Sequence, residues 1–187
     1  MNKIFISATF AGVLISIGCK AYINVGPILG PFLFAIGILS ILHLKLHLFT
    51  GKIPYISNYK EVPEIVAILI GNMLGCNLMW LFPSNTSISI INNKLNENLL
   101  FVFIEAILCN ILIYIAVEAY KKQDVLTIVL AIATFILAGF EHSIANMCYI
   151  ISARVFNFKV LIFIIVVIIG NTIGGLLAHN IHKRVNK

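Results

Sequence analysis

The stretch Gly139-Phe140-Glu141-His142-Ser143-Ile144-Ala145-Asn146-Met147 places a carboxylate, an imidazole and a carboxamide inside a long apolar segment, residues 125–153. An ionisable side chain at membrane depth costs roughly 3 kcal/mol or more, so it tends to face a protein interior or a wet cavity. Gly139 and the polar residues that follow the charged pair, including Asn146, can satisfy backbone groups where a helix is interrupted. The stretch therefore predicts a membrane helix that is broken at Glu141 and His142.

The composition of the whole chain indicates a membrane protein. Of its 187 residues 60% are hydrophobic and 11% are charged, and the mean hydropathy is +1.04. Soluble domains carry about one-quarter charged residues, so the composition argues against a water-soluble enzyme. The net charge is +6, but the basic residues lie mostly between long apolar runs, which indicates membrane topology rather than nucleic-acid binding. Four cysteines in apolar surroundings, without a CxxC pair, predict neither a zinc site nor a disulfide scaffold.

Apolar segments near the length that crosses hydrocarbon, about 20 residues, recur along the chain. There are six, at residues 3–24, 28–56, 63–82, 99–120, 125–153 and 159–181. The second and fifth are too long for a simple crossing and carry polar groups, so both are expected to be broken helices. In the second segment the break is expected at Leu48-Phe49-Thr50-Gly51, the counterpart of the break at Glu141 and His142. There Gly51 permits backbone angles that a helix cannot use, Thr50 offers a hydroxyl, and the two breaks are expected to meet at mid-membrane.

A short internal repeat divides the chain in the same way. Gly71-Asn72-Met73-Leu74-Gly75 returns 99 residues later as Gly170-Asn171-Thr172-Ile173-Gly174. Glycines four apart permit close contact between helices. Three crossings per half require the halves to be inverted, which predicts one transmembrane domain, residues 1–187, of two inverted repeats at about 1–92 and 93–187. With the N-terminus inside, eight basic residues lie on the inner side and four on the outer, so both termini are expected in the cytoplasm.

At these residues the sequence resembles the formate/nitrite transporter family, whose members include channels for formate, nitrite and hydrosulfide. The resemblance is carried by residues 139–147 and continues through Leu48-Phe49-Thr50, Leu108-Cys109-Asn110 and Gly170-Asn171, so that it covers essentially the whole chain. It implies an aquaporin-like all-α fold in the cell membrane, assembled as a homopentamer with one pore per subunit. It implies no enzyme activity, no cofactor and no metal.

The resemblance also implies roles for individual residues. It places His142, Thr50, Asn110 and Asn171 at the centre of the pore, Phe34, Ile38, Leu48 and Phe135 at its constrictions, and Lys3 and Lys94 at the two vestibules. Gly139, Asn146, Glu141 and Gly51 are expected to support the breaks.

The sequence departs from the family pattern at two places. Lys45-Leu46-His47 stands where the family usually has Gly-x-acidic, and Glu105-Ala106 stands where it usually has Arg-Gly. The two sign reversals raise the hypothesis that His47 and Glu105 preserve an ion pair with its charges exchanged.

These residues predict how a small anion could cross. An anion between apolar rings is poorly stabilised, whereas its neutral conjugate acid crosses more cheaply. We expect Lys3 and Lys94 to concentrate the anion of a weak acid at the two mouths, and protonation near His142 to neutralise it. Because a carboxylate on the pore would repel an anion, Glu141 is expected to turn away and accept hydrogen bonds from backbone N–H groups.

Two alternatives stay open at this level. One is an aquaporin-like channel for small neutral solutes, although no Asn-Pro-Ala sequence is present. The other is an intramembrane metalloenzyme that uses His43, His47, His142 and Glu141 as ligands, although no compact ligand triad is apparent. The expected partners are a small weak-acid anion and membrane lipid, and no nucleic acid.

Overall fold

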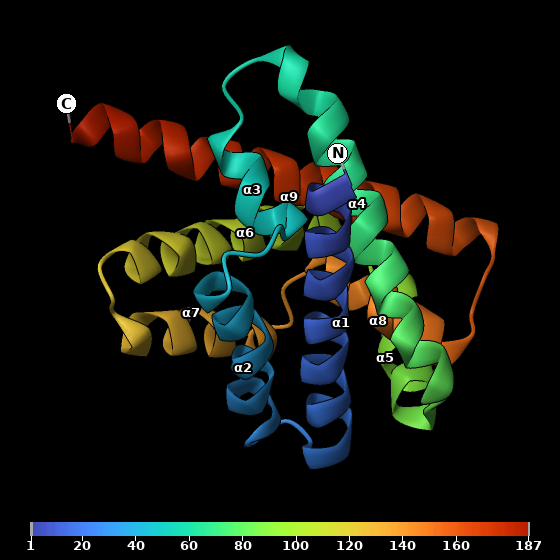
Figure 1. Ribbon diagram of the computed structural model, residues 1–187. Helices are drawn as coiled ribbons and strands as arrows, with labels where there is room; N and C mark the ends of the chain where they lie inside the picture. The colour runs from blue at the N-terminus through green and yellow to red at the C-terminus, as the bar shows by residue number, and fades with distance from the viewer. Residues whose placement is uncertain (1, 187) are drawn as a thin grey trace.

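The computed structural model describes residues 2–186, and these residues form helices and connections without a strand (Figure 1). The α-helices are α1 (Asn2–Val25), α2 (Gly30–His43), α3 (Phe49–Lys52), α4 (Val62–Cys76), α5 (Asn85–Leu95), α6 (Leu99–Lys121), α7 (Val125–Leu137), α8 (Ser143–Ala153) and α9 (Phe158–Val185). Short 3-10 helices are η1 (Ile53–Tyr55), η2 (Tyr59–Glu61) and η3 (Asn77–Leu81), the last two flanking α4.

Four helical segments are long and apolar enough to cross a membrane, namely Asn2–Val25, Tyr59–Leu81, Leu99–Lys121 and Phe158–Val185. Three shorter apolar helices, α2, α7 and α8, lie among them. The long helices bury one face and expose large hydrophobic side chains on the other; α1, for example, buries Ala8 and Ile15 and exposes Ile6 and Phe10. Apolar side chains on the outside as well as the inside are typical of helices surrounded by lipid or by other subunits.

The glycines of the internal repeat lie where two pairs of helices approach most closely. A Cβ at Gly71 of α4 would lie 2.8 Å from the Cβ of Ala8 on α1, and a Cβ at Gly170 of α9 would lie 2.5 Å from that of Ala106 on α6. Only a residue without a side chain permits this packing. In Figure 1 the first pair runs from top to bottom and the second pair runs across it.

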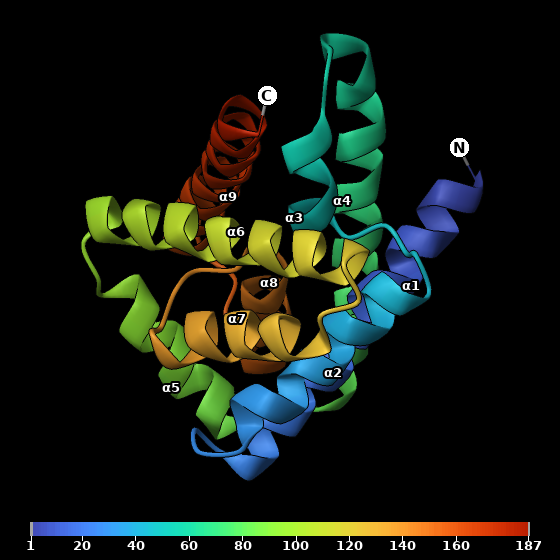
Figure 2. The same cartoon turned by 90° about the vertical axis from the view of Figure 1, so that its left-hand side faces the viewer.

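Both of the long apolar segments are interrupted. Helix α2 ends at His43 and α3 begins at Phe49, while α7 ends at Leu137 and α8 begins at Ser143. Helix α7 packs against both α6 and α2 (Figure 2), so the two interrupted segments lie together in the bundle.

The backbone role expected of Gly51 is wrong. Gly51 lies inside the short helix α3, and the left-handed residue of the first break is Lys45, with φ 54°. The reason is that α2 ends at His43 and α3 begins at Phe49, so the helix is broken before Leu48 and not after Thr50. In the second break Gly139 has φ 78°, a conformation that glycine adopts without steric cost.

Candidate functional site

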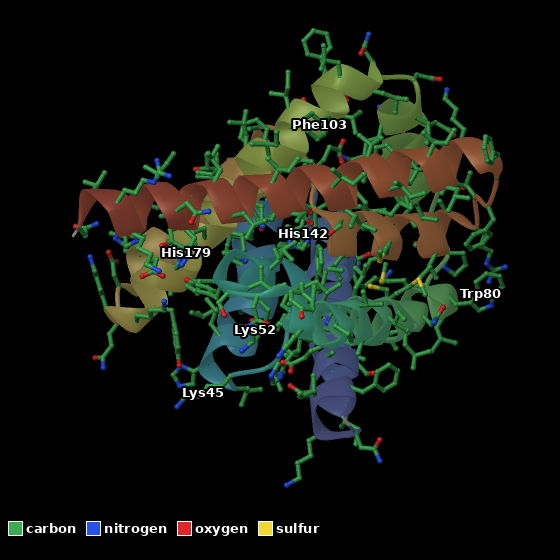
Figure 3. The ribbon with its side chains drawn as sticks, turned by 90° about the horizontal axis from the view of Figure 1, so that it is seen from above. Lys45, Lys52, Trp80, Phe103, His142 and His179 are labelled. Atoms are coloured by element: carbon green, nitrogen blue, oxygen red, sulfur yellow. The ribbon has the colours of Figure 1, made fainter. Side chains whose placement is uncertain are left out.

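His142 lies at the N-cap of α8, and its side chain is 1% exposed. Its Nδ1 accepts a hydrogen bond from the backbone N–H of Ala145 at 3.2 Å, and its Nε2 lies 3.0 Å from Oγ1 of Thr50. Thr50 belongs to α3, so this contact joins the two interrupted segments. In Figure 3 His142 lies at the centre of the bundle.

The hydrogen bonds of His142 assign its tautomer. Because Nδ1 accepts from Ala145, the proton of the neutral imidazole sits on Nε2 and is donated to the hydroxyl oxygen of Thr50. The hydroxyl hydrogen of Thr50 is then left to donate to another group. Thr50 is fully buried, and its hydroxyl has no other hydrogen bond among the described residues.

Asn72 holds the first break in place. Its Oδ1 accepts from the backbone N–H of Phe49 at 2.8 Å. Its Nδ2 donates to the carbonyl oxygens of Ala8 at 2.8 Å and of His47 at 2.9 Å. The side chain thus satisfies backbone groups on both sides of Leu48, which is the N-cap residue of α3.

Asn171 does the same for the second break. Its Oδ1 accepts from the backbone N–H of Ser143 at 2.9 Å, and its Nδ2 donates to the carbonyl oxygens of Ala106 and Glu141, both at 2.8 Å. Its donors and its acceptor are therefore engaged, and Asn171 fixes backbone rather than offering a free polar group. The Asn72 role was missed from the sequence, although the repeated Gly-Asn pair was the signal that could have found it.

Asn110 is fully buried on α6. Its Nδ2 donates to the carbonyl oxygen of Asn171 at 2.6 Å, while its Oδ1 has no hydrogen-bond partner. A buried acceptor without a partner is uncommon in folded proteins. The structure therefore leaves one free acceptor on Asn110 and one free donor on Thr50.

Two cavities approach the centre from opposite ends and share no lining residue. The first, here called the His142 cavity, has a volume of about 110 Å³ and is lined by Phe34, Phe135 and His142 among others. The second, the Leu48 cavity, has a volume of about 460 Å³ and is lined by Ile38 and Leu48 among others. All four expected constriction residues thus lie on one cavity or the other.

The layer between the two cavities is apolar and tightly packed. Phe34 and Phe135 meet edge to face with ring centres 6.0 Å apart, and the ring of Phe135 stacks on His142 at 5.6 Å. Phe34, which lines the His142 cavity, and Ile38, which lines the Leu48 cavity, are one turn apart on α2, about 6 Å along the helix axis. The exposed fractions of Phe34, Ile38, Leu48 and Phe135 are all 3% or less.

Glu141 is fully buried, and its hydrogen-bond partners differ from those expected. Its Oε1 pairs with Nζ of Lys94 at 2.7 Å, and its Oε2 accepts from Nδ2 of Asn146 at 2.6 Å. The partners are side chains and not backbone N–H groups, because Lys94 reaches the break from the last turn of α5. Lys94 lines the His142 cavity as a partner in an ion pair. Lys3 is exposed in the first turn of α1.

The hypothesis that His47 pairs with Glu105 is wrong. Nδ1 of His47 lies 2.8 Å from Oγ of Ser7 on α1. Glu105 lies instead with Glu97 and Glu141, where one carboxylate oxygen from each falls within 4.8 Å of the others. The helix packing separates the two substituted positions, which a count of charges along the chain does not reveal.

The histidines of the metalloenzyme alternative are not brought together. The ring of His43 packs edge-on against Tyr120, with ring centres 6.3 Å apart, and His47 hydrogen-bonds to Ser7. Within residues 2–186 the three carboxylates named above are the only group of three potential metal ligands within 4.8 Å of one another, and none of the histidines belongs to it.

Comparison with known proteins identifies the family. The family model described as "Formate/nitrite transporter" matches residues 1–182. The chain belongs to the formate/nitrite transporter family. The resemblance seen in the sequence is thereby confirmed, and this family member is a multi-pass membrane transport protein rather than an enzyme.

Two solved structures share the fold of this family member. One, described as "Pentameric formate channel with formate bound", is 20% identical with a TM-score of 0.79, over 98% of this chain and 94% of that chain. The other, described as "FNT family ion channel", is 20% identical with a TM-score of 0.88, over 99% and 90% of the two chains. A comparison with curated proteins gave no match.

Proposed function

We propose that the chain is a channel for small monovalent anions of weak acids, of the formate, nitrite or hydrosulfide class, in which His142 assists protonation at the central constriction. The observation that carries the proposal is the hydrogen-bonded pair of His142 and Thr50, buried between two cavities in an otherwise apolar layer. Family membership and the fold shared with a formate-bound channel support the same conclusion.

The proposed architecture is one transmembrane domain, residues 1–187, with six spans in two inverted halves, about 1–92 and 93–187. The equivalent hydrogen bonds of Asn72 and Asn171 and the matching contacts of Gly71 and Gly170 support the two halves. The fold of a channel described as pentameric supports a homopentamer. The distribution of basic residues supports a cell-membrane location with both termini in the cytoplasm.

The apolar layer determines which form of the solute crosses. Phe34 and Phe135 on one side and Ile38 and Leu48 on the other offer no group that could replace the water around an anion. Transfer of an unpaired ion into such surroundings is far more costly than transfer of its neutral conjugate acid. An anion that has combined with a proton therefore passes at a lower free energy than the bare anion.

His142 and Thr50 act on the solute through the Thr50 hydroxyl. The Nε2–H of His142 polarises this hydroxyl, which donates to the solute as it leaves the cavity water. In this proposal a proton from cavity water binds Nδ1 of His142 and breaks the hydrogen bond from Ala145. Transfer of the Nε2 proton through the Thr50 hydroxyl to the anion then leaves a neutral imidazole and a neutral acid. The free acceptor Oδ1 of Asn110 suits the O–H of a neutral acid.

The test is reconstitution into liposomes, with uptake of formate, nitrite and hydrosulfide measured across a series of pH values. Uptake of at least one of these solutes is expected to rise as the pH falls, because the proton is a co-reactant of passage. Replacement of His142 by Asn keeps a polar side chain of lower volume but cannot take up a proton, and the pH dependence is expected to flatten.

Two results would count against the proposal. If the His142→Asn protein keeps both the wild-type rate and the wild-type pH dependence, the imidazole has no role in passage. Swelling of the liposomes in a neutral osmolyte, with no response to any of the three anions, favours the aquaporin-like alternative instead.

A further inference from the structure

Three lysines from three different segments line the Leu48 cavity. They are Lys45 in the first break, Lys52 at the end of α3 and Lys121 at the end of α6, and no carboxylate lines the same cavity. Figure 3 shows Lys45 and Lys52 on one side of the bundle. From the sequence Lys3 was expected at a vestibule, and nothing indicated that Lys52 and Lys121 line this cavity.

The charges of these lysines are only partly balanced. Nζ of Lys121 pairs with Glu118 at 2.6 Å and lies 4.2 Å from the ring centre of Tyr55. Among residues 2–186 the ion pairs are that one and the pair of Lys94 with Glu141, so Lys45 and Lys52 have no carboxylate within 4.0 Å. The Leu48 cavity therefore carries a net positive charge next to an apolar constriction.

The backbone at Lys45 is unfavourable for a residue with a side chain. Its φ is 54°, in the left-handed region that glycine adopts without a steric penalty. Strain of this kind persists where the surrounding structure imposes it, and it is concentrated at functional sites. Gln123, with φ 58°, has the same backbone in the nearby connection between α6 and α7 and lines neither of the two central cavities, so it provides a matched comparison.

The opposite mouth has the reverse balance of charge. Lys94 is already bound to Glu141, and Glu97 and Glu105 lie within 4.8 Å of the same carboxylate. A second ammonium group lies at the rim, where Nζ of Lys159 donates to Oδ1 of Asn96 at 3.3 Å, so three carboxylates stand against two ammonium groups. Lys94 and the three carboxylates line one open depression that shares Ile90, Lys94 and Gly139 with the His142 cavity.

We propose that this chain collects its anions from one end only: Lys45, Lys52 and Lys121 form the anion-collecting site in the Leu48 cavity, while the acidic opposite mouth disfavours anion entry. The inference rests on the proposed function, because it assumes that anions cross the central layer. The ligand class is any small monovalent anion, since exposed ammonium groups select charge and size rather than shape.

The two chain ends identify the collecting end. His47, next to the Leu48 cavity, contacts Ser7 in α1, and Tyr114, whose ring lies 5.8 Å from that of Tyr55, hydrogen-bonds to His182 near the end of α9. The Leu48 cavity therefore opens at the end of the bundle where both termini lie. A tag at the C-terminus reports which way each protein faces in a liposome.

The experiment measures initial rates of formate flux in each direction through liposomes of known protein orientation, at neutral pH and at low and high ionic strength. In the wild-type protein the KM for formate entry at the end where both termini lie is expected to be lower than the KM for entry at the opposite end. Lys45→Gly and Lys52→Gln should each raise that KM by roughly two- to fourfold, the effect of one unit charge about 10 Å away in a wet mouth, with the maximal rate unchanged. High salt should weaken the difference, because it screens exposed charges.

Two controls separate charge from backbone effects. Gln123→Gly relieves the same left-handed strain as Lys45→Gly without removing a charge, and it is expected to leave KM unchanged. Lys45→Arg retains the charge and should keep the wild-type KM. In the opposite mouth Glu97→Gln is expected to lower the KM for entry from that end only.

The outcomes distinguish this inference from the proposed function. If formate crosses but KM is equal from both ends and does not respond to Lys45→Gly and Lys52→Gln, the one-sided collection is wrong and the channel function stands. If neither formate nor nitrite nor hydrosulfide crosses in either direction, the proposed function fails and this inference fails with it.

Discussion

Asn72 and Asn171, 99 residues apart in the sequence, make the same three hydrogen bonds across the two helix breaks. In each case Oδ1 accepts from the first N–H after the N-cap residue, and Nδ2 donates to the carbonyl oxygen before that residue and to a carbonyl oxygen of the neighbouring long helix. The N-cap residues themselves, Leu48 and His142, have nearly the same backbone, with φ −102° in both. The two halves therefore place an apolar side chain at one break and an imidazole at the other.

We predict that Asn171→Leu and Asn72→Leu destabilise the protein to a similar degree. Each change leaves two buried backbone groups of the break without partners, at about 1–3 kcal/mol per group, because the carbonyls of Ala8 and Ala106 keep the hydrogen bonds within their own helices. The midpoint of thermal unfolding in detergent is expected to fall by roughly 10 °C or more. Asn92→Leu on the exposed face of α5 is the control and should leave the midpoint within about 2 °C. A large difference between Asn72→Leu and Asn171→Leu would contradict the equivalence of the two breaks.

Gly174→Ala is predicted to disrupt the contact between α9 and α6. A Cβ at this position would clash with the backbone carbonyl of Ile107, which cannot move without displacing the helix. The expected cost is about 1–3 kcal/mol, measured as a lower midpoint of thermal unfolding. Gly51→Ala is the control, because a Cβ there would lie 3.6 Å from Cγ2 of Val117, an ordinary contact. Equal stability of the two variants would show that the close approach is not required.

Thr50→Val is predicted to slow anion transport while the protein stays folded. The change removes the hydroxyl that bonds to His142 and retains the shape of the side chain. Loss of one hydrogen bond to a charged solute corresponds to a rate about tenfold to a hundredfold lower. Thr50→Ser keeps the hydroxyl and is expected to transport at a rate close to that of the wild type. The measurement is the initial rate of formate flux in liposomes, and equal rates for Val and Ser would refute a hydrogen-bonding role of Thr50.

A double-mutant cycle on Lys94 and Glu141 is predicted to show strong coupling. Lys94→Gln leaves a fully buried carboxylate beside two others, whereas Glu141→Gln leaves a lysine that is 17% exposed and close to Glu105. Lys94→Gln should therefore lower the thermal midpoint more than Glu141→Gln. The double variant should be more stable than the sum of the single effects predicts, by about 1–3 kcal/mol. Additive effects would mean that the pair contributes nothing beyond its separate residues.

Much of the fold was readable from local features of the sequence. Hydropathy and segment length located the apolar helices, and the polar residues of 43–50 and 141–146 located the two interruptions. Such features are local because a helix satisfies its own backbone groups and meets an apolar environment along its whole length. The position of the left-handed residue was not readable, because the end of α2 depends on its packing and Lys45 is not a residue that favours positive φ.

The roles of individual polar side chains were readable only in part. The charged pair at Glu141 and His142 marked the second break, but the sequence did not show that Lys94 neutralises the first and Thr50 bonds to the second. Nor did it show that Lys45, Lys52 and Lys121 face one cavity. The contact of Lys94 with Glu141 joins residues 47 positions apart, and that of Thr50 with His142 joins residues 92 positions apart. Local sequence patterns do not reveal such contacts.

By itself the sequence determined that this protein is a helical membrane transporter of a known family, since composition, periodic apolar length and a nine-residue motif are properties of the chain before it folds. Only the tertiary structure decided which polar atoms meet. It brought the side chains of Asn72 and Asn171 to the backbone of the two breaks and His142 to Thr50, and it gave the two mouths opposite charges. Hydrogen bonds and ion pairs depend on distances of a few ångströms between atoms on different helices, and close packing at glycine contacts sets those distances.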